Sequence, residues 1–238
     1  MISAACAGCG TCSAECKVGA IEMRHFSDQA IYAQIDAILE DDPQQKIVTF
    51  ACNWCSYAGA DTAGVSRLEY PPNARIIRTM CSGRVNPEFV WYSFQKGAPV
   101  VLVSGCHYVD CHYIDANRST VRRMDGLWDG LVKSGIRPER LLLEWCSAAE
   151  GVRWQTIMQA TEEKRQMVTL EELEHTRDVL SKARVPRPRN PKAADEDQEA
   201  QFACRRCGHH WGHIFNVNRE RTCPECRSNS VHWLRQRD

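Results

Sequence analysis

Fourteen cysteines are the residues of this 238-residue sequence best suited to chemistry, because thiolates bind metals and thiol pairs can be oxidised. The short spacings among many of them favour metal binding over a disulfide framework. The first residues lack the basic start and apolar segment of a secretory signal, and no apolar run is long enough to span a membrane. We therefore expect reduced, metal-binding cysteines in a cytoplasmic protein with no membrane contact. They form three groups: Cys6, Cys9, Cys12 and Cys16; Cys52, Cys55, Cys81, Cys106, Cys111 and Cys146; Cys204, Cys207, Cys223 and Cys226.

The first group has the Cys-x2-Cys-x2-Cys-x3-Cys spacing with which bacterial ferredoxins hold a 4Fe–4S cluster. It departs from that pattern at Lys17, where ferredoxins usually carry proline. In two-cluster ferredoxins the fourth cysteine of each run binds the other cluster. Two arrangements stay open. All four cysteines bind one local cluster, or a partner chain completes the cluster of Cys6, Cys9 and Cys12 while Cys16 reaches a cluster in that partner.

The last group consists of two Cys-x2-Cys pairs separated by fifteen residues, which is typical of a tetrahedral zinc site. Iron in a rubredoxin-like site is the alternative. Residues 202–238 are too few for an independent apolar core, so metal binding would supply much of the folding free energy of this zinc-ribbon-like unit. We expect its apolar side chains to pack around the metal: Trp211, Ile214, Phe215, Val217, Val231, Trp233 and Leu234.

The middle group depends on the elements that position it. Apolar, β-branched runs at 46–50, 74–79, 99–105 and 140–145 alternate with helical segments at 60–69, 86–96, 112–134 and 147–165. This alternation predicts an α/β fold, a small doubly wound parallel sheet of about four strands.

Each cysteine of the middle group follows one of these predicted strands. Since the carboxyl ends of parallel strands share one edge, we expect six thiols at that edge, around an iron–sulfur cluster. Arg84, His107 and His112 are candidates for tuning the cluster through hydrogen bonds, and either histidine could instead be a ligand, as in Rieske centres.

The rest of the chain divides readily. We expect a helix from Ser27, its candidate N-cap, to Leu39, and a capping-box pattern at Thr169–Glu172 predicts a helix to about Ala183. Residues 186–201, rich in proline and charge, read as a flexible linker. The predicted units are a ferredoxin-like segment (1–40), the α/β domain (46–165), a helix with linker (166–201) and the ribbon (202–238).

Two stretches resemble known families. FACNWCSYAGADTAG, RTMCSGRVNPEF, GCHYVDCHY and WCSAAEG, across about residues 46–154, resemble the delta subunit family of methyl-viologen-reducing hydrogenase. This resemblance implies a 2Fe–2S cluster on four of Cys52, Cys55, Cys81, Cys106 and Cys111, without Cys146. Residues 1–39 resemble the C-terminal ferredoxin tail of the large flavin-binding subunit of heterodisulfide reductase. Together they imply an electron-transfer subunit that works with such a flavoprotein, in a hydrogenase, formate dehydrogenase or other anaerobic reductase complex, such as the benzoyl-CoA type.

Other functions are less well supported. The sequence has no dinucleotide fingerprint, nucleophile elbow or HExxH pair, which favours a non-catalytic subunit within an oxidoreductase complex. One alternative is a thiol–disulfide oxidoreductase using Cys52 and Cys55. Another is a nucleic-acid-binding zinc protein with a redox sensor, since the ribbon carries seven arginines. The balance of thirty basic and thirty acidic residues gives no general support for nucleic acid as a partner.

Overall fold

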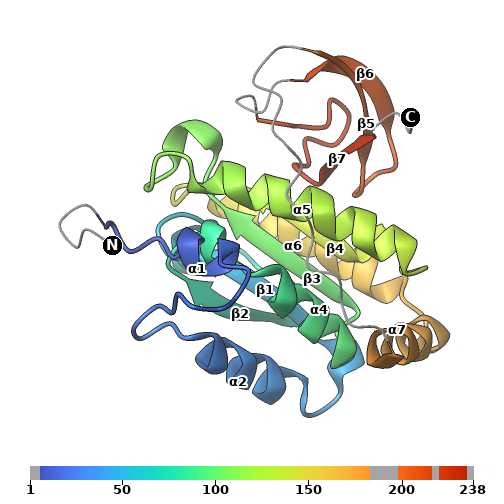
Figure 1. Ribbon diagram of the computed structural model, residues 1–238. Coiled ribbons are helices and arrows are strands. Elements are labelled where there is room, and N and C mark those ends of the chain that lie inside the picture. The colour runs from blue at the N-terminus through green and yellow to red at the C-terminus, as the bar shows by residue number, and fades with distance from the viewer. Residues whose placement is uncertain (1–5, 183–197, 216–219, 235–238) are drawn as a thin grey trace.

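A four-stranded parallel sheet forms the centre of the computed structural model, which describes residues 6–182, 198–215 and 220–234 (Figure 1). The strands lie in the order β2-β1-β3-β4, and β1 pairs with both β2 and β3. This confirms the predicted α/β class. The strands are β1 (Ile47–Cys52), β2 (Ala74–Thr79), β3 (Val100–Gly105) and β4 (Leu141–Trp145).

Side chains alternate along each strand, so the buried central strands present apolar residues on both faces of the sheet. Helices cover both of these faces. Val48 and Phe50 pack with α2 (Asp28–Leu39), α4 (Pro87–Gln95) and α5 (Ala116–Lys133). On the other face, Ile47 and Ala51 pack with α3 (Ser56–Val65) and α6 (Gly151–Gln166). Short 3-10 helices lie at η2 (Pro43–Gln45), η3 (Ser82–Arg84), η4 (Tyr108–Asp110) and η5 (Pro138–Arg140). The fold is therefore doubly wound.

Local capping explains where two of the helices begin. The Ser27 hydroxyl accepts a hydrogen bond from Ala30 N at 3.2 Å, as predicted for the start of α2. At α7 (Leu170–Lys182), Glu172 N donates to Thr169 Oγ1 at 3.2 Å and Thr169 N donates to Glu172 Oε2 at 3.0 Å. The capping box is confirmed, and α7 packs against the end of the α/β domain (Figure 1).

The C-terminal unit is a three-stranded antiparallel sheet in the order β6-β5-β7. Its strands are β5 (Gln198–Cys204), β6 (His210–Phe215) and β7 (Val231–Leu234). The predicted linker is thus wrong at its end, because residues 198–201 pair with β6 rather than forming a tether. Its remainder up to 197 lies outside the described residues.

The small core of this unit differs from prediction at Ile214. Phe202, Val231, Trp211 and Trp233 pack with three of the cysteines, but Ile214 is 44% exposed. Ile214 lies on the face of β6 opposite Trp211, where Gly212 is also exposed, so alternation turns its side chain outward. Val217 lies outside the described residues.

Candidate metal centres

Five cysteines meet at the carboxyl edge of the parallel sheet, where β1 and β3 lie side by side. The chain leaves β1 toward β2 on one side, while β3 continues to β4 on the other, so this is the switch point where ligands bind in open α/β sheets. Sγ atoms of Cys52, Cys55 and Cys106 all lie within 4.8 Å of one another. Cys111 packs against these three, and Cys81 lies close enough to Cys52 and Cys111 for both to raise its pKa.

The five thiols cannot all ionise by themselves. Cys52 Sγ is 3.8 Å from Cys106 Sγ, and hydrogen bonds with Cys106, Cys55 and Cys81 lower the pKa of Cys52. Hydrogen bonds with Cys106 and Cys81 likewise lower the pKa of Cys111 to about 2. The pKa of Cys81 is raised instead, by hydrogen bonding with Cys111 and Cys52. Crowded thiolates repel one another, and a cationic iron centre replaces the protons that the set otherwise shares, so these donors fit an iron–sulfur cluster.

Cys146 lies apart from the other five. Its thiol is fully buried with Ala60, Ala63 and Trp154 on the α3–α6 face, and it donates to the Ser147 and Glu150 carbonyl oxygens at 3.5 Å. The expectation of six thiols together is wrong for this residue, because Trp145 faces the opposite layer and alternation sends Cys146 to the apolar one. Burial raises the pKa of Cys146 to about 12, as expected for an inert core thiol.

The three residues predicted to tune the cluster, Arg84, His107 and His112, make different kinds of contact. His112 stacks on Trp54 at 3.9 Å beside the cysteines, whereas the His107 ring lies between Glu220 and Glu150, 3.0 Å from each. The hydrogen bond with Glu220 raises the pKa of His107. Arg84 is fully buried, pairs with Asp28 and donates to the Phe26 carbonyl oxygen at 3.0 Å, so it holds the N-terminal segment. Their effect on a cluster stays a prediction.

Several residues around the site were not singled out from the sequence. Trp54 Nε1 donates to Tyr113 Oη at 2.9 Å, which ties the Cys52–Cys55 turn to the loop after Cys111. Asn117 is fully buried and donates to the Cys106 and His107 carbonyl oxygens at 3.1 and 3.0 Å. The one available signal was the position of Trp54 inside the Cys-x2-Cys turn.

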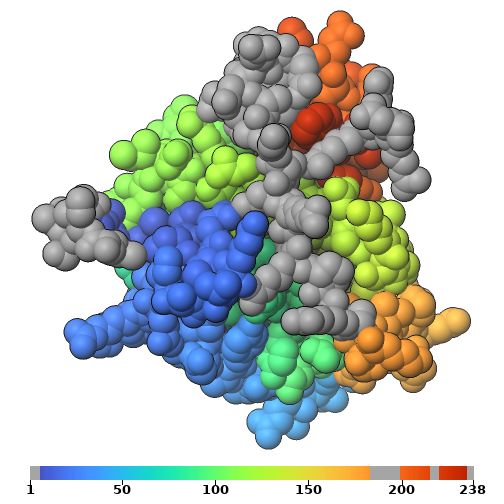
Figure 2. All heavy atoms as spheres, viewed as in Figure 1, coloured from blue at the N-terminus to red at the C-terminus, as the bar shows by residue number. Residues whose placement is uncertain are grey.

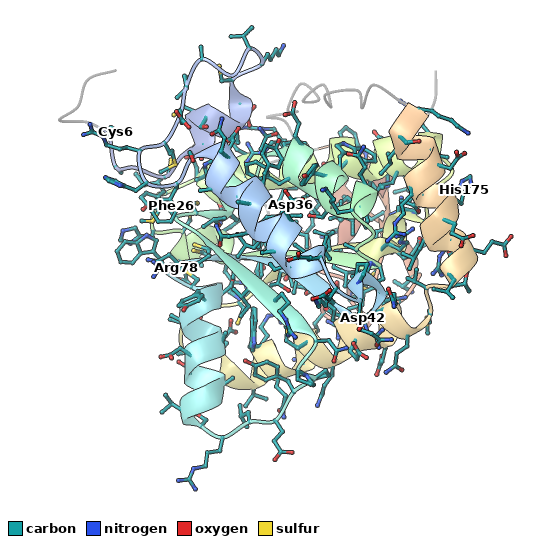
Figure 3. All side chains as sticks on the ribbon, turned by 90° about the horizontal axis from the view of Figure 1, so that it is seen from below. Cys6, Phe26, Asp36, Asp42, Arg78 and His175 are labelled. Carbon is teal, nitrogen blue, oxygen red and sulfur yellow. The ribbon has the colours of Figure 1, made fainter. Side chains whose placement is uncertain are left out.

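The N-terminal cysteines are less enclosed. Cys6 and Cys12 are exposed, and no three of the four sulfurs, all of which belong to described residues, form a cluster like the one at the sheet edge. Figure 3 shows Cys6 at the periphery of the molecule, and Figure 2 shows the blue N-terminal segment on its surface. Hydrogen bonds from the Val18 and Ala20 amides lower the pKa of Cys16, and Ala20 N lies 3.3 Å from its sulfur. Backbone amides thus already favour a thiolate there.

This N-terminal segment contacts the sheet-edge site directly. Helix α1 (Thr11–Glu15) packs on η3, and Cys9 Sγ donates to Thr11 Oγ1 at 3.4 Å. A Cβ added to Gly83 would lie 2.3 Å from Thr11 Oγ1, so the hydroxyl can approach this closely because residue 83 is glycine. Gly83 N in turn donates to Cys81 Sγ at 3.3 Å. A short series of contacts therefore joins Cys9 of one group to Cys81 of the other.

The four C-terminal cysteines form the second compact group. The Sγ atoms of Cys204, Cys207, Cys223 and Cys226 all lie within 4.8 Å of one another. Cys204 Sγ is 3.6 Å from Cys226 Sγ, and Cys207 Sγ is 3.7 Å from Cys223 Sγ. Four convergent sulfurs, two of them buried, suit a closed tetrahedral site.

The family model described as methyl-viologen-reducing hydrogenase, delta subunit, matches residues 47–168. The chain belongs to this family. The matched range holds the whole sheet-edge site, whereas the N-terminal run and the C-terminal knuckles lie outside it. Among the described residues of this delta-subunit family member, no helix combines the length and apolar character needed to span a bilayer.

Individual relatives carry two kinds of name. The F420-non-reducing hydrogenase vhc iron-sulfur subunit of Methanococcus voltae is 50% identical over 115 residues, which cover 48% of this chain and 80% of the relative. The F420-non-reducing hydrogenase iron-sulfur subunit of Archaeoglobus profundus is 44% identical over 120 residues, 50% of this chain and 88% of the relative. One chain of the ferredoxin:CoB-CoM heterodisulfide reductase of Methanosarcina mazei is 48% identical over 179 residues, covering 63% of this chain but only 23% of that protein.

Proposed function

We propose that this chain relays single electrons within a cytoplasmic, anaerobic oxidoreductase complex. Four of Cys52, Cys55, Cys81, Cys106 and Cys111 would hold a 2Fe–2S cluster, and the run from Cys6 to Cys16 would contribute to a 4Fe–4S cluster. Such clusters supply one-electron chemistry, while the protein sets their spacing and surroundings. The four C-terminal cysteines would hold a structural zinc ion.

The observation that carries this proposal is the direct packing of the N-terminal run on the sheet-edge site. The contacts from Cys9 through Thr11 and Gly83 to Cys81 give two cysteine groups a common boundary. Tyr113 accepts a hydrogen bond from Trp54 at the sheet-edge group. Burial raises the pKa of Tyr113, and the charges of Cys81, Cys52 and Cys9 raise it further. Neighbouring redox centres with no intervening domain are what an electron relay requires.

The partner we propose is a flavoprotein resembling the large flavin-binding subunit of heterodisulfide reductase. Similarity to this chain occurs both in separate hydrogenase subunits and within a much longer heterodisulfide reductase chain. A domain found separately in one system and within a longer chain in another is expected to work beside the rest of that chain. The exposed Cys6 and Cys12 suit a cluster completed by such a partner, and the parent complex would be hydrogenase-linked, formate-linked or of the benzoyl-CoA reductase type.

A thiol–disulfide oxidoreductase is poorly supported by the geometry. Cys52 is 1% exposed and Cys55 is 6% exposed, so a protein disulfide has no access to the attacking sulfur. Both also lie against Cys106, which a dithiol enzyme does not need.

Iron, acid-labile sulfide and zinc analysis of the anaerobically purified chain, together with electron paramagnetic resonance, tests the proposal. We expect a reducible 2Fe–2S signal from the chain alone and about one zinc. Adding the flavoprotein partner should then allow reduction of the flavin through this chain. A colourless protein with no labile sulfide would refute the relay.

A further inference from the structure

The C-terminal unit contacts the α/β domain through two segments. They lie on either side of the turn Cys223–Cys226, which carries two of the four cysteines of the candidate zinc site. The segment before this turn, residues 220–222, reaches the loop that joins Cys106 to Cys111. The segment after it, residues 228–230, reaches strand β4. We refer to them as the first and second docking arms.

The first docking arm holds the cysteine loop through a single carboxylate. Glu220 Oε1 lies 3.0 Å from His107 Nδ1, and Glu220 Oε2 accepts a hydrogen bond from Tyr108 N at 2.9 Å. His107 and Tyr108 directly follow Cys106. Behind Glu220, Arg221 forms a two-pronged ion pair with Asp125 of α5, at 2.9 and 2.7 Å. This arm therefore fixes the backbone of a loop that supplies two of the five sheet-edge sulfurs.

The second docking arm completes the open edge of the parallel sheet. Strand β4 lies at the edge of the described sheet, so its outer backbone groups have no strand to pair with there. Ser230 Oγ accepts from Leu143 N at 2.8 Å and donates to Leu143 O at 2.9 Å, and Asn229 Oδ1 accepts from Trp145 N at 3.2 Å. The fully buried Ser228 donates to the buried carboxylate of Glu144 at 2.5 Å. These polar partners make docking specific, because Glu144 would otherwise be a poorly satisfied buried carboxylate.

The two arms are linked to each other and to the turn between them. Asn229 Nδ2 donates to Glu220 Oε1 at 3.2 Å. Cys223 N donates to Ser228 O at 2.9 Å, and Arg227 N donates to Cys223 O at 3.0 Å. The conformation that presents both arms is thus the one that brings Cys223 and Cys226 together with Cys204 and Cys207.

We propose that the metal ion of the C-terminal knuckles braces the Cys106–Cys111 loop, and so preserves the iron–sulfur site that lies outside its own domain. This inference rests on the proposed function. Since metal binding stabilises the folded knuckle, and only the folded knuckle presents Glu220, the two metal sites are thermodynamically coupled. The arginines of this unit agree with a role within the chain, because Arg205, Arg206 and Arg221 pair with Glu139, Glu144 and Asp125 of the α/β domain.

Glu220→Ala in the full chain tests the brace, with Glu225→Ala as the matched control. Both remove a carboxylate from the same unit, but Glu225 is exposed within the knuckle turn. We expect both variants to retain zinc. Under an iron chelator, Glu220→Ala should lose its 2Fe–2S absorbance about tenfold faster than Glu225→Ala, as expected when charge-assisted hydrogen bonds are lost. Removing zinc from the wild-type chain should have the same effect.

Amide hydrogen exchange of residues 106–115 gives a readout that needs no iron. Faster exchange in Glu220→Ala than in Glu225→Ala supports the brace, and equal exchange with equal cluster loss overturns it. A wild-type chain without any 2Fe–2S cluster would instead refute the proposed function, and the exchange comparison would still decide on the brace.

Discussion

The sheet-edge cysteines and the N-terminal cysteines differ in how far the fold has arranged them. Cys52 ends strand β1, Cys81 and Cys106 follow β2 and β3, and each of the three is no more than 2% exposed. The N-terminal four lie on a five-residue helix and its flanking loops, with Cys6 and Cys12 exposed. The first group is preorganised by a packed core, whereas the fold does little to enclose the second.

This difference follows from the amount of apolar surface behind each site. Strands β1 and β3 are buried along their whole length, so their ends are held in place by the core. Helix α1 buries only Ser13 and is fastened mainly by polar contacts, such as the ion pair between Glu15 and the buried Arg123. Under the proposed function, a cluster or a partner chain would supply much of the ordering free energy at the N-terminal run.

The largest expected effect is that of Cys106→Ala compared with Cys146→Ala. Both thiols are buried, but only Cys106 lies within the group of convergent sulfurs. We expect Cys106→Ala to lose nearly all of the 2Fe–2S paramagnetic signal, and Cys146→Ala to keep it. Iron counts with electron paramagnetic resonance provide the measurement. A full signal in Cys106→Ala would contradict this expectation and leave Cys52, Cys55, Cys81 and Cys111 as the four ligands.

The next effect concerns dependence on a partner. If a partner chain must complete the N-terminal cluster, the isolated protein should hold its 2Fe–2S cluster but fill its 4Fe–4S site only in part. Adding the flavoprotein partner should bring iron and sulfide to full occupancy. Stable, complete 4Fe–4S loading of the chain by itself would show that the N-terminal run is as self-sufficient as the sheet edge.

Gly83→Ala addresses the boundary between the two sites. The new Cβ would lie 2.3 Å from Thr11 Oγ1 and 3.1 Å from the carbonyl oxygen of Ala116, so the contact between Thr11 and Gly83 must change. Such overpacking typically costs about 1–3 kcal/mol. We expect lower stability in denaturant and weaker magnetic interaction between the two clusters, with each cluster still present.

The control for this variant is Gly64→Ala on α3, where an added Cβ meets no atom within 4 Å. Alanine in a helix is favoured over glycine by about 0.5–1 kcal/mol, so this change should be neutral or stabilising. If both variants show the same stability in denaturant and the same magnetic interaction between the clusters, the close approach at Gly83 does not determine how strongly the two sites interact.

The strands and helices of the α/β domain could be predicted from the sequence because their apolar patterns depend on residues that are close together in the chain. The four predicted strands match β1 to β4 within about two residues, and five of the six strand-end thiols converge as expected. The position of Cys146 could not be predicted from strand ends alone. Side chains alternate along the strand, so Trp145 and Cys146 face opposite layers of the sheet. Contacts such as Glu220 with His107, 113 residues apart, arise from docking between units and leave no local pattern.

The smallest expected effect comes from Trp54, which links the two halves of the sheet-edge site. Trp54→Phe keeps an aromatic ring against His112 but removes the 2.9 Å hydrogen bond to Tyr113. Loss of one such bond costs about 0.5–1.5 kcal/mol, so we expect the cluster to remain and its loss under chelator to quicken only modestly. Tyr113→Phe removes the same bond from the other side. Since the two changes share one interaction, the double variant should lose hardly more than either alone, and fully additive effects would show that Trp54 acts through something other than this bond.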